Sequence, residues 1–456
     1  MSSSVNGRTT DSSSGFDAVV VGGGSAGLAF AKRASSLGAR VALIEEDELG
    51  GTCVNRGCVP KKLLWHVAHV RRTEEALVES GHVLSVPPLD LGRTQAAIGQ
   101  HIAGLRDGFA DALDDCGVTL LRGRAGMDGQ GRVMFDGDVL SAERVVIACG
   151  SEPTAPDVPG LELADLSHDV FSWREVPERL LILGGGYIGV EFASIFSGFG
   201  TEIGLADEGE EILEGFDKDA IVHVRRHLER DGVTFEFGTA LASIERSSNA
   251  LMARLENGRE FACDRVLFAV GRQPRIAGLG SIADALEYAE SGALAVSDGL
   301  ETSKEGVFAI GDAADRMPLT PVARRDGQWL ADSLFAAPEQ PLLDLDLVAT
   351  VAYSDPPIAQ VGRLEPGGLN VTHADVSPLK DGLLRQVDGR NAGDETFFYK
   401  LLTEGEDGPV RGAALVSRSA ANEISWAAAA IAGGLTRRAM ALPGAVHPSF
   451  TEEFIG

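Results

Sequence analysis

Two cysteines, Cys53 and Cys58, lie close together within the stretch GTCVNRGCVPKK at 51–62. Pro60 is typical of the first turn of a helix, so the pattern places Cys53 at a turn and Cys58 at a helix N-terminus. The helix dipole and the free N–H groups of such an N-terminus lower the pKa of a thiol. The stretch is therefore predicted to hold a dithiol/disulfide pair that exchanges readily.

By itself, the pair is also compatible with a zinc site or with two inert core cysteines. Zinc needs two further Cys or His ligands, and none is suitably spaced, so no metal site is expected. Cys116, Cys149 and Cys263 fall in or beside apolar stretches and are expected to be buried structural thiols. Five cysteines are an odd number, unlike a secreted disulfide framework, which favours a reducing compartment such as the cytoplasm.

The segment before this pair carries a dinucleotide-binding fingerprint. A strand is expected at 16–21, a glycine-rich turn at 22–27, a helix at 28–37 and a second strand at 41–44 that ends in an acid. Glycines permit the tight turn, the helix N-terminus binds pyrophosphate, and the acid binds ribose hydroxyls. The candidate residues are Gly22, Gly24, Ser25, Gly27 and Glu45.

The fingerprint recurs later in the chain, where a strand at 180–183 precedes Gly184, Gly186 and Gly189, and Asp207 takes the place of the acid. The three glycines and the acid repeat at one constant offset, so the chain is predicted to hold two dinucleotide sites. A third signal, VFAIGD at 307–312, reads as a buried strand ending in Gly-Asp. This aspartate suits a hydrogen bond to a flavin's ribityl chain, and taken alone it is equally compatible with a turn.

Further motifs follow in a fixed order: ACG at 148–150, Tyr187 in the second fingerprint, GRQP at 271–274, TPVA at 320–323 and HP at 447–448. With these motifs, the chain from 16 to 453 resembles the flavoprotein disulfide reductases of the glutathione reductase type. The resemblance implies an α/β fold with two Rossmann-like domains, for FAD and NAD, and an α+β C-terminal dimerisation domain. The implied boundaries are an FAD domain at 16–155, an NAD(P)H domain at 156–279, an FAD return segment at 280–343 and a dimerisation domain at 344–456. Further cofactor-binding residues implied in this way are Gly51, Thr52, Gly150, Gly311, Asp312, Thr320 and Arg272. The segment 1–15 is rich in Ser, Thr and Asn and is expected to be a disordered tail.

The resemblance also implies roles in the chemistry. Cys58 would be the sulfur next to the flavin, and Cys53 would attack the substrate disulfide. Tyr187 would cover the nicotinamide side of the flavin, and Lys61, paired with Glu191, would lie near flavin N5. His447, oriented by Glu452, would reach the cysteines from the other subunit, which implies a homodimer with shared active sites.

One departure from the glutathione reductase pattern concerns the nucleotide. The loop ADEGEEILE at 206–214 has no basic residue, and Asp207 stands where a carboxylate binds both ribose hydroxyls of NAD. Glu208 and Glu214 occupy the places of the arginines that bind the 2′-phosphate of NADPH. A carboxylate ~4 Å from a phosphate costs up to roughly 4 kcal/mol per unit charge before screening. NADH is therefore expected as the donor, with NADPH less favoured.

The second departure concerns the disulfide pocket. Lys32 and Gln328 stand for the two arginines that hold the glycine carboxylates of glutathione, and Phe109 stands for the pocket tyrosine. Arg324, one helical turn before Gln328, is available to compensate. Fewer cationic donors suit the amide form of glutathione, as in glutathione amide reductases. Glutathione disulfide, glutathione amide disulfide and another small thiol disulfide all remain open as substrates.

Related enzyme classes fit less well. Dihydrolipoamide dehydrogenases share NADH and the His-Pro motif, but their redox stretch normally ends Pro-Ser-Lys or Pro-Thr-Lys, not PKK. Mercuric reductases need a C-terminal cysteine pair and large thioredoxin reductases a redox-active tail, and neither is expected in a sequence that ends at Gly456. A non-catalytic flavin scaffold is disfavoured because the candidate catalytic residues are all present.

Composition narrows the partners. The 456 residues suffice for about three domains, and the net charge of −27, with pI about 4.7, disfavours nucleic acid and anionic membranes. No apolar run of the sequence approaches the length of a transmembrane helix, so no membrane span is expected. The acidic excess is compatible with a saline habitat and with ordinary solubility.

Overall fold

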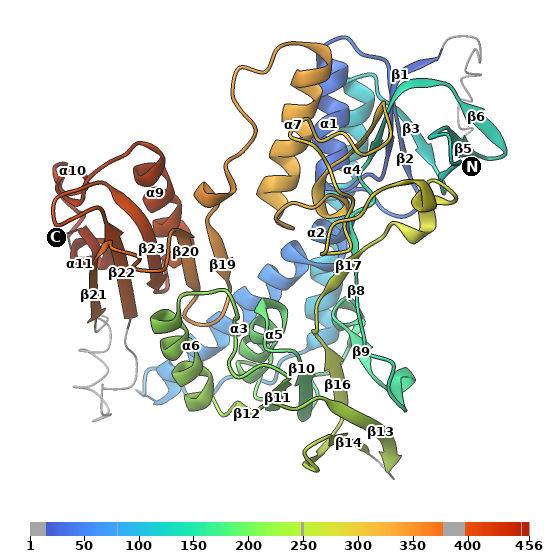
Figure 1. The fold of residues 1–456 in the computed structure, drawn as a ribbon. Coiled ribbons are helices and arrows are strands. Elements are labelled where there is room, and N and C mark those ends of the chain that lie inside the picture. The colour runs from blue at the N-terminus through green and yellow to red at the C-terminus, as the bar shows by residue number, and fades with distance from the viewer. Residues whose placement is uncertain (1–14, 80, 248–249, 377–396, 448, 456) are drawn as a thin grey trace. The chain divides into compact units, whose positions relative to one another are not determined.

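The computed structural model describes residues 15–79, 81–247, 250–376, 397–447 and 449–455 (Figure 1). The tail expected at 1–15 lies outside the described residues apart from Gly15. The chain forms two compact units, each assembled from three segments. Unit 1 comprises Met1–Asn55, His101–Glu152 and Gln273–Leu343, and unit 2 comprises Arg56–Gln100, Pro153–Arg272 and Asp344–Gly456.

Unit 1 is built on a parallel sheet with the order β18-β7-β1-β2-β3. The strands are β1 (Phe16–Val21), β2 (Val41–Glu45), β3 (Thr119–Arg122), β7 (Ala142–Ile147) and β18 (Val307–Ala309). Strand β1 reads FDAVVV, and its last four residues are buried, as expected of a central strand in a parallel sheet. A small antiparallel sheet, β4 (Gly126–Met127), β5 (Val133–Phe135) and β6 (Asp138–Leu140), belongs to the same unit.

Helices α1 (Ser25–Ser36) and α7 (Thr320–Phe335) pack side by side in unit 1 (Figure 1). Gly327 of α7 permits this approach, because a Cβ there would lie 2.5 Å from the carbonyl oxygen of Ala26 in α1. The pairing thus brings the segment after β1 together with a segment from much later in the chain.

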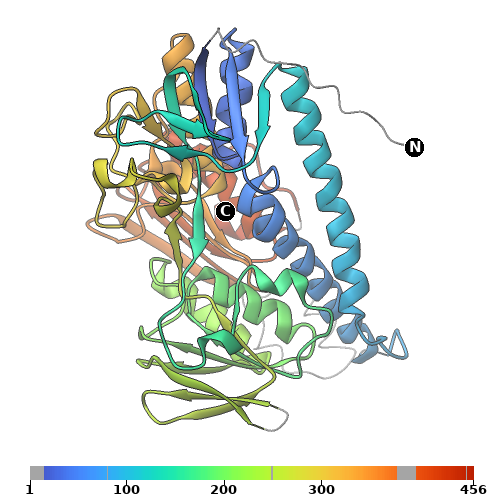
Figure 2. The same cartoon turned by 90° about the vertical axis from the view of Figure 1, so that its right-hand side faces the viewer.

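Unit 2 contains a second parallel sheet, with the order β12-β11-β10-β16-β9. Its strands are β9 (Asp165–Leu166), β10 (Arg179–Leu183), β11 (Glu202–Asp207), β12 (Thr234–Phe237) and β16 (Arg265–Phe268), and its helices are α5 (Tyr187–Ser197) and α6 (Lys218–Arg230). An antiparallel sheet of β13 (Leu241–Ser247), β14 (Ala250–Leu255) and β15 (Glu260–Cys263) belongs to the same unit and lies at the bottom of Figure 2. The strands β8 (Ser151–Pro153) and β17 (Arg272–Pro274) lie where the chain passes from one unit to the other.

The C-terminal part of unit 2 is an antiparallel sheet with the order β19-β20-β23-β22-β21. Its strands are β19 (Thr350–Ala352), β20 (Ile358–Gly362), β21 (Asn370–Val376), β22 (Phe397–Thr403) and β23 (Val410–Val416). The helices α9 (Ala420–Ala432), α10 (Arg437–Ala441) and α11 (Phe450–Ile455) follow. All of β22 is buried, and Lys400 within it is held by two carboxylates of the α6 segment, at 2.7 Å from Asp217 and 2.8 Å from Asp219.

Three helices follow the first fingerprint: α2 (Gly51–Arg56), α3 (Cys58–Glu79) and α4 (Leu91–Asp115). Cys58 is the first residue of α3, as the sequence predicts, but the expectation of a turn at Cys53 is wrong, because Cys53 lies inside the short helix α2. Asn55 stabilises this helix, since its side-chain amide donates to the carbonyl oxygens of Glu48, Leu49 and Gly51. Within the described part of the chain, no helix is both long and apolar enough to cross a membrane.

Candidate active site

The first glycine-rich loop connects β1 to α1 in unit 1. Gly22 has a φ of +112°, and a Cβ there would lie 2.3 Å from Ala148 O. A Cβ on Gly27 would lie 1.9 Å from Gly22 O, so neither position accepts a side chain. In contrast, the nearest atom to a Cβ on Gly24, the residue before Ser25 and α1, is Gly51 Cα at 3.8 Å. Open backbone at a helix N-terminus is the setting that a pyrophosphate needs.

The acid at the end of β2 is fixed by this loop. Glu45 accepts hydrogen bonds from the backbone N–H of Gly23 at 2.6 Å and of Asp47 at 2.8 Å. Burial raises the pKa of the Glu45 carboxyl above its usual value, and the hydrogen bond from Gly23 opposes that shift. The carboxylate is thus held beside the loop, where a ribose hydroxyl would be bound.

The second loop, in unit 2, reproduces the same geometry. Gly184 has a φ of +108°, and a Cβ on Gly189 would lie 1.9 Å from Gly184 O. A Cβ on Gly186 would have no described atom within 4 Å. Asp207 accepts from the backbone N–H of Gly185 and of Gly209, both at 2.6 Å, as Glu45 does in the first loop. Both loops therefore fit a dinucleotide, and the repeat of the sequence is also a repeat of the hydrogen bonds.

Other candidate cofactor residues of unit 1 cluster near the first loop or at the ends of neighbouring elements. A Cβ on Gly51 would lie 2.8 Å from Gly24 Cα, and Gly311 packs against α1, where its Cβ would lie 3.0 Å from Ala26 Cβ. Asp312 accepts a hydrogen bond from Ser151 Oγ at 2.6 Å. The remaining candidates are Thr52 in α2, Gly150 with a φ of +70° after β7, and Thr320 as the first residue of α7.

Helix α3 in unit 2 carries the candidate redox residues Cys58 and Lys61. Cys58 is exposed and begins the helix, and the backbone N–H of Lys61 donates to Gly57 O at 3.0 Å. Cys53, in unit 1, is half-buried. Cys58 thus lies at the N-terminus of a 22-residue helix, the position that the sequence predicts.

The expected partners Lys61 and Glu191 are in contact. Lys61 Nζ lies 2.6 Å from Glu191 Oε1, and the side chains are 13% and 5% exposed. The backbone N–H of Tyr353 donates to the same carboxylate oxygen at 2.9 Å, and the centroid of the Tyr353 ring lies 4.5 Å from Lys61 Nζ. One oxygen of the buried carboxylate thus accepts from two donors, the Lys61 ammonium and the Tyr353 backbone N–H. Tyr353 lies far from Lys61 in the sequence and was not identified from it, because no motif marks this tyrosine.

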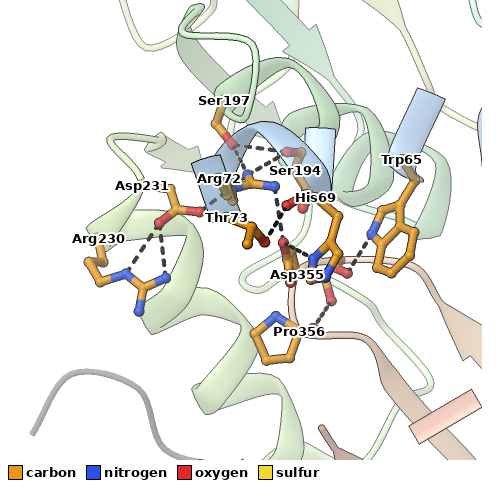
Figure 3. A network of polar contacts seen from close by, with 11 residues as sticks. Trp65, His69, Arg72, Thr73, Ser194, Ser197, Arg230, Asp231, Asp355 and Pro356 are labelled. Carbon is orange, nitrogen blue, oxygen red and sulfur yellow. Dashed lines mark hydrogen bonds and ion pairs between the residues drawn. The ribbon is translucent and has the colours of Figure 1, made fainter. Parts of the chain in front are cut away.

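A polar network holds the next turns of α3 (Figure 3). Asp355 lies 3.0 Å from His69 Nδ1 and 3.4 Å from Arg72 Nη1. Arg72 also donates to Ser194 O and Ser197 Oγ of α5, at 2.5 Å and 2.7 Å. The network therefore connects α3 to α5 and to the segment after β19.

The two candidates at the C-terminus also meet. His447 Nδ1 lies 2.8 Å from Glu452 Oε1, and the backbone N–H of Ser449 donates to the other oxygen of that carboxylate at 3.1 Å. The hydrogen bond from His447 lowers the pKa of Glu452. The His447 side chain is 80% exposed, which leaves Nε2 accessible to another molecule. Pro448, the second residue of the His-Pro motif, lies outside the described residues.

The candidate substrate residues all belong to unit 1. Lys32 Nζ lies 6.0 Å from the centroid of the Phe109 ring, within cation–π range. Arg324 and Gln328 are exposed on α7, one helical turn apart. Lys32 therefore lies against the Phe109 ring, and Arg324 lies on the exposed side of α7.

The loop after β11 contains an ion pair that the sequence did not reveal. Glu208 and Glu214 are exposed, as expected of residues facing a ligand. Glu211 binds Arg225 of α6 at 3.1 Å, and Arg225 also binds Glu229 at 3.0 Å. Among the described contacts of this loop, Arg225 is the basic residue that reaches it, and Arg225 already forms ion pairs with two carboxylates.

Two more candidates lie at the starts of elements: Tyr187 begins α5 and is 46% exposed, and Arg272 begins β17. The expectation for the other cysteines holds only in part. Cys263 is buried and Cys149 is half-buried, and burial raises the pKa of Cys263 to about 11 and of Cys149 to about 12; Cys116 is exposed, because it follows α4 at the surface. Among the described residues, no cluster of His, Cys, Asp and Glu fits a metal ion.

Comparisons with known proteins agree with this geometry. Residues 16–327 match the pyridine nucleotide-disulphide oxidoreductase family, and residues 348–455 match the dimerisation domain of that family. The chain is 34% identical to a glutathione reductase of Burkholderia cepacia, over 96% of this chain and 98% of the relative. It is 32% identical to a glutathione reductase of Nostoc sp. strain PCC 7120, again over 96% and 98%. A dihydrolipoyl dehydrogenase of Bacillus subtilis is 30% identical over 96% of this chain and 94% of that protein. The chain therefore belongs to the pyridine nucleotide-disulphide oxidoreductases, FAD-dependent enzymes that use NAD(P)H, and within them it is a glutathione reductase-like flavoprotein reductase.

Proposed function

We propose that the protein is an NADH-preferring, FAD-dependent reductase of a small thiol disulfide, either glutathione disulfide or glutathione amide disulfide. The observation that carries this proposal is helix α3, which begins at Cys58 and one turn later presents Lys61 locked to the buried carboxylate of Glu191. A structural cysteine would not need a charged, oriented lysine beside it. The domain boundaries implied by the family resemblance, at 155/156, 279/280 and 343/344, are part of the same proposal.

The FAD would be held by the first glycine-rich loop, Glu45 and Asp312, and when bound it supplies the two-electron relay from nicotinamide to the cysteines. The chain's residues do the thiol chemistry. The helix N-terminus and its charges hold Cys58 as a thiolate, and Cys53 Sγ attacks the substrate disulfide, releasing one thiol and forming a mixed disulfide. Cys58 Sγ then displaces the second thiol and restores the Cys53–Cys58 disulfide. The net change is one disulfide reduced to two thiols for each NADH oxidised.

A proton must reach each leaving thiolate. His447 Nε2 is the proposed donor, and Glu452 fixes the ring by holding Nδ1. We propose that His447 acts on the cysteines of a second copy of this chain, which fits its exposure and the match of 348–455 to the dimerisation domain. We also expect a cytoplasmic location, because an odd number of cysteines with two of them redox-active suits a reducing compartment.

The preference for NADH rests on the loop after β11. Asp207 keeps lone pairs available for the two ribose hydroxyls after accepting its two backbone hydrogen bonds. A 2′-phosphate would meet the exposed carboxylates of Glu208 and Glu214, and Arg225 is occupied by Glu211 and Glu229. The exposed carboxylates would therefore repel the 2′-phosphate of NADPH. Among the described contacts of this loop, the one arginine is already paired with carboxylates and would not bind that phosphate.

The substrate is proposed from the weakened carboxylate clamp. Initial rates of NADH oxidation by the purified protein, measured with glutathione disulfide and with its bis-amide, test it directly. Faster turnover of the bis-amide is expected if Lys32 and Gln328 provide the weak clamp. Equal or faster turnover of glutathione disulfide would show that Arg324 restores the clamp and would contradict the amide preference.

The identity to a dihydrolipoyl dehydrogenase keeps a second candidate open. Lys61 and Lys62 favour the glutathione reductase type, because the lipoamide enzymes normally carry Ser or Thr before a single lysine. Turnover of lipoamide faster than that of either glutathione derivative would reverse this choice.

A further inference from the structure

Lys62, the residue after Lys61, lies between two aromatic rings. Its Nζ is 3.4 Å from the centroid of Trp65 and 3.6 Å from that of Tyr353. Trp65 is held in place, because its indole N–H donates to Ser354 O at 2.9 Å and its ring stacks on His69. The half-buried cation is thus confined by an aromatic clamp that is itself fixed.

The position of Lys62 on α3 places it on the same face of the helix as the redox cysteine. Lys62 is four positions after Cys58, and residues at this spacing lie on the same face of a helix, one turn apart. A charge on Lys62 therefore acts on Cys58 in addition to the helix dipole.

The charged groups around Lys62 do not neutralise it. On α3, Lys61 and His66 interact electrostatically with it; from α5, Glu191 does so; and from the segment after β19, Asp355 does so. Tyr353 lies against Lys62 and is itself acted on by the charge of Cys58. Glu191 is taken by Lys61, and Asp355 by His69 and Arg72. Among the described residues, no carboxylate forms an ion pair with Lys62.

These surroundings make the charge of Lys62 easy to lose. Burial lowers the pKa of Lys62 to about 7, and the positive charge of Lys61 acts in the same direction, while Glu191 and Asp355 oppose it. The ammonium is therefore stabilised further only when another negative charge appears near it, and the thiolate of Cys58 is such a charge.

We propose that Lys62 is a positioning residue that gains a proton when the Cys53–Cys58 disulfide is reduced and loses it when the disulfide re-forms. The inference rests on the proposed function. The hydride of NADH supplies two electrons and one proton: the electrons break the S–S bond and leave two thiolates, and the proton goes to Cys53. A second proton, from solvent, goes to Lys62 Nζ, on the helix face that carries the Cys58 thiolate. Re-formation of the disulfide by substrate removes the thiolate, and the Lys62 proton returns to solvent.

The first test needs no mutation. Competitive acetylation of Lys62 in the oxidised holoenzyme, read by mass spectrometry across pH, is expected to give a midpoint near 7, and reduction by NADH without oxygen is expected to raise it. A midpoint near that of an ordinary lysine in the oxidised protein, or one that reduction leaves in place, would overturn the proposal.

The second test follows the thiolate. In the reduced holoenzyme, the long-wavelength absorbance of a thiolate beside oxidised flavin should disappear at low pH, and Lys62→Met should move that acid midpoint upward by about one pH unit, because the thiolate loses its cation. Lys62→Arg keeps a charge at every pH and is expected to hold the midpoint near or below that of the wild type. Lys304→Met, which lies in unit 1 and outside the clamp, serves as the matched control.

A failure of the proposed function can be distinguished from a failure of the role proposed for Lys62. If NADH produces no thiolate absorbance even in the wild-type protein, the proposed function fails. If the absorbance appears but Lys62→Met leaves its midpoint unchanged, only the role of Lys62 fails. Flavin content and unfolding midpoints confirm that each variant is folded, and the acetylation experiment on the wild type stands if Lys62→Met does not fold.

Discussion

At the scale of single residues, the proposed preference for NADH rests on three carboxylates: Asp207, which ends β11, and Glu208 and Glu214, which follow it. Asp207 is fixed by the backbone of its own loop, and Glu208 and Glu214 are exposed. The positions of these carboxylates could be predicted from the sequence, because they follow directly from the strand and the glycines of the second fingerprint. The ion pair of Arg225 with Glu211 could not be predicted from the sequence, because it joins a helix residue to a residue of a separate loop.

Replacing both exposed carboxylates tests this assignment. Glu208→Arg with Glu214→Arg should raise kcat/KM for NADPH by an order of magnitude or more, because two repulsive charges become attractive ones. Steady-state kinetics with NADH and NADPH measure the change. Glu210→Arg, an exposed carboxylate of the same loop outside the two phosphate positions, is the matched control. Two results would contradict the assignment: an equally large rise of kcat/KM for NADPH in the control, or an unchanged ratio of NADH to NADPH use in the double variant. Either would mean that other residues set the nucleotide selectivity.

Contacts of single residues across long stretches of chain were only partly predictable. The ion pair of Lys61 with Glu191 followed from the family resemblance, and the structure places the two side chains in contact. Tyr353 and the clamp around Lys62 carry no motif, so nothing in the local sequence indicated that a ring from a distant segment would cover Lys62. Such pairs depend on tertiary packing, which a local pattern does not encode.

At the scale of elements, the proposed redox function depends on helix α3. Its first turn carries Cys58, Lys61 and Lys62, and its later turns are fixed by the network around Asp355 (Figure 3). The sequence predicted the start of α3, because Pro60 favours a first turn. It did not predict α2, since this short helix lacks an apolar period and is stabilised by the side chain of Asn55.

The anchor of α3 has a measurable effect on stability. Burial alone would raise the pKa of Asp355, but the hydrogen bond to His69 and the charge of Arg72 outweigh it and hold the pKa at about 2. Because this is below the unfolded value, the carboxylate stabilises the fold by about 2 kcal/mol at pH values above about 4, and this contribution is lost as the pH falls through about 2. Asp355→Asn should therefore lower the free energy of unfolding by at least this amount at neutral pH.

Urea unfolding of the wild type and of Asp355→Asn, from pH 7 downward, checks this expectation. The difference between the two should be constant at neutral pH and should narrow below about pH 4. Asp298→Asn, at an exposed position of unit 1, should change little. Equal stability of wild type and Asp355→Asn at pH 7 would contradict the role given to the network.

At the scale of the whole molecule, the chain forms two units from three segments each. The repeated fingerprint predicted both parallel sheets, because glycine positions and strand ends specify a βαβ unit. An α+β C-terminal dimerisation domain was predicted only through the family resemblance, and its antiparallel sheet was not predicted, since its strands carry no motif of their own. The match of 348–455 to a dimerisation domain agrees with that prediction.

A shared active site predicts complementation between inactive subunits. Cys58→Ser and His447→Ala should each be inactive, but in a mixed dimer the intact cysteines of one subunit meet the intact histidine of the other. Random association should restore about a quarter of the wild-type activity when both are co-expressed. Co-expression of Cys58→Ser with Cys53→Ser should restore none. If the first pair also stays inactive although mixed dimers form, His447 acts within its own chain.

In the proposed function, electrons from NADH reach the Cys53–Cys58 pair. The most direct measurement is an anaerobic titration of the oxidised holoenzyme with NADH, followed by a count of thiols after denaturation. Both thiols of the pair are expected to appear with the first equivalent of NADH, whereas Cys58→Ser, in which Cys53 is a thiol from the start, is expected to gain none. Loss of the flavin colour without any gain of thiols would contradict it, because the electrons would then stop before the cysteines.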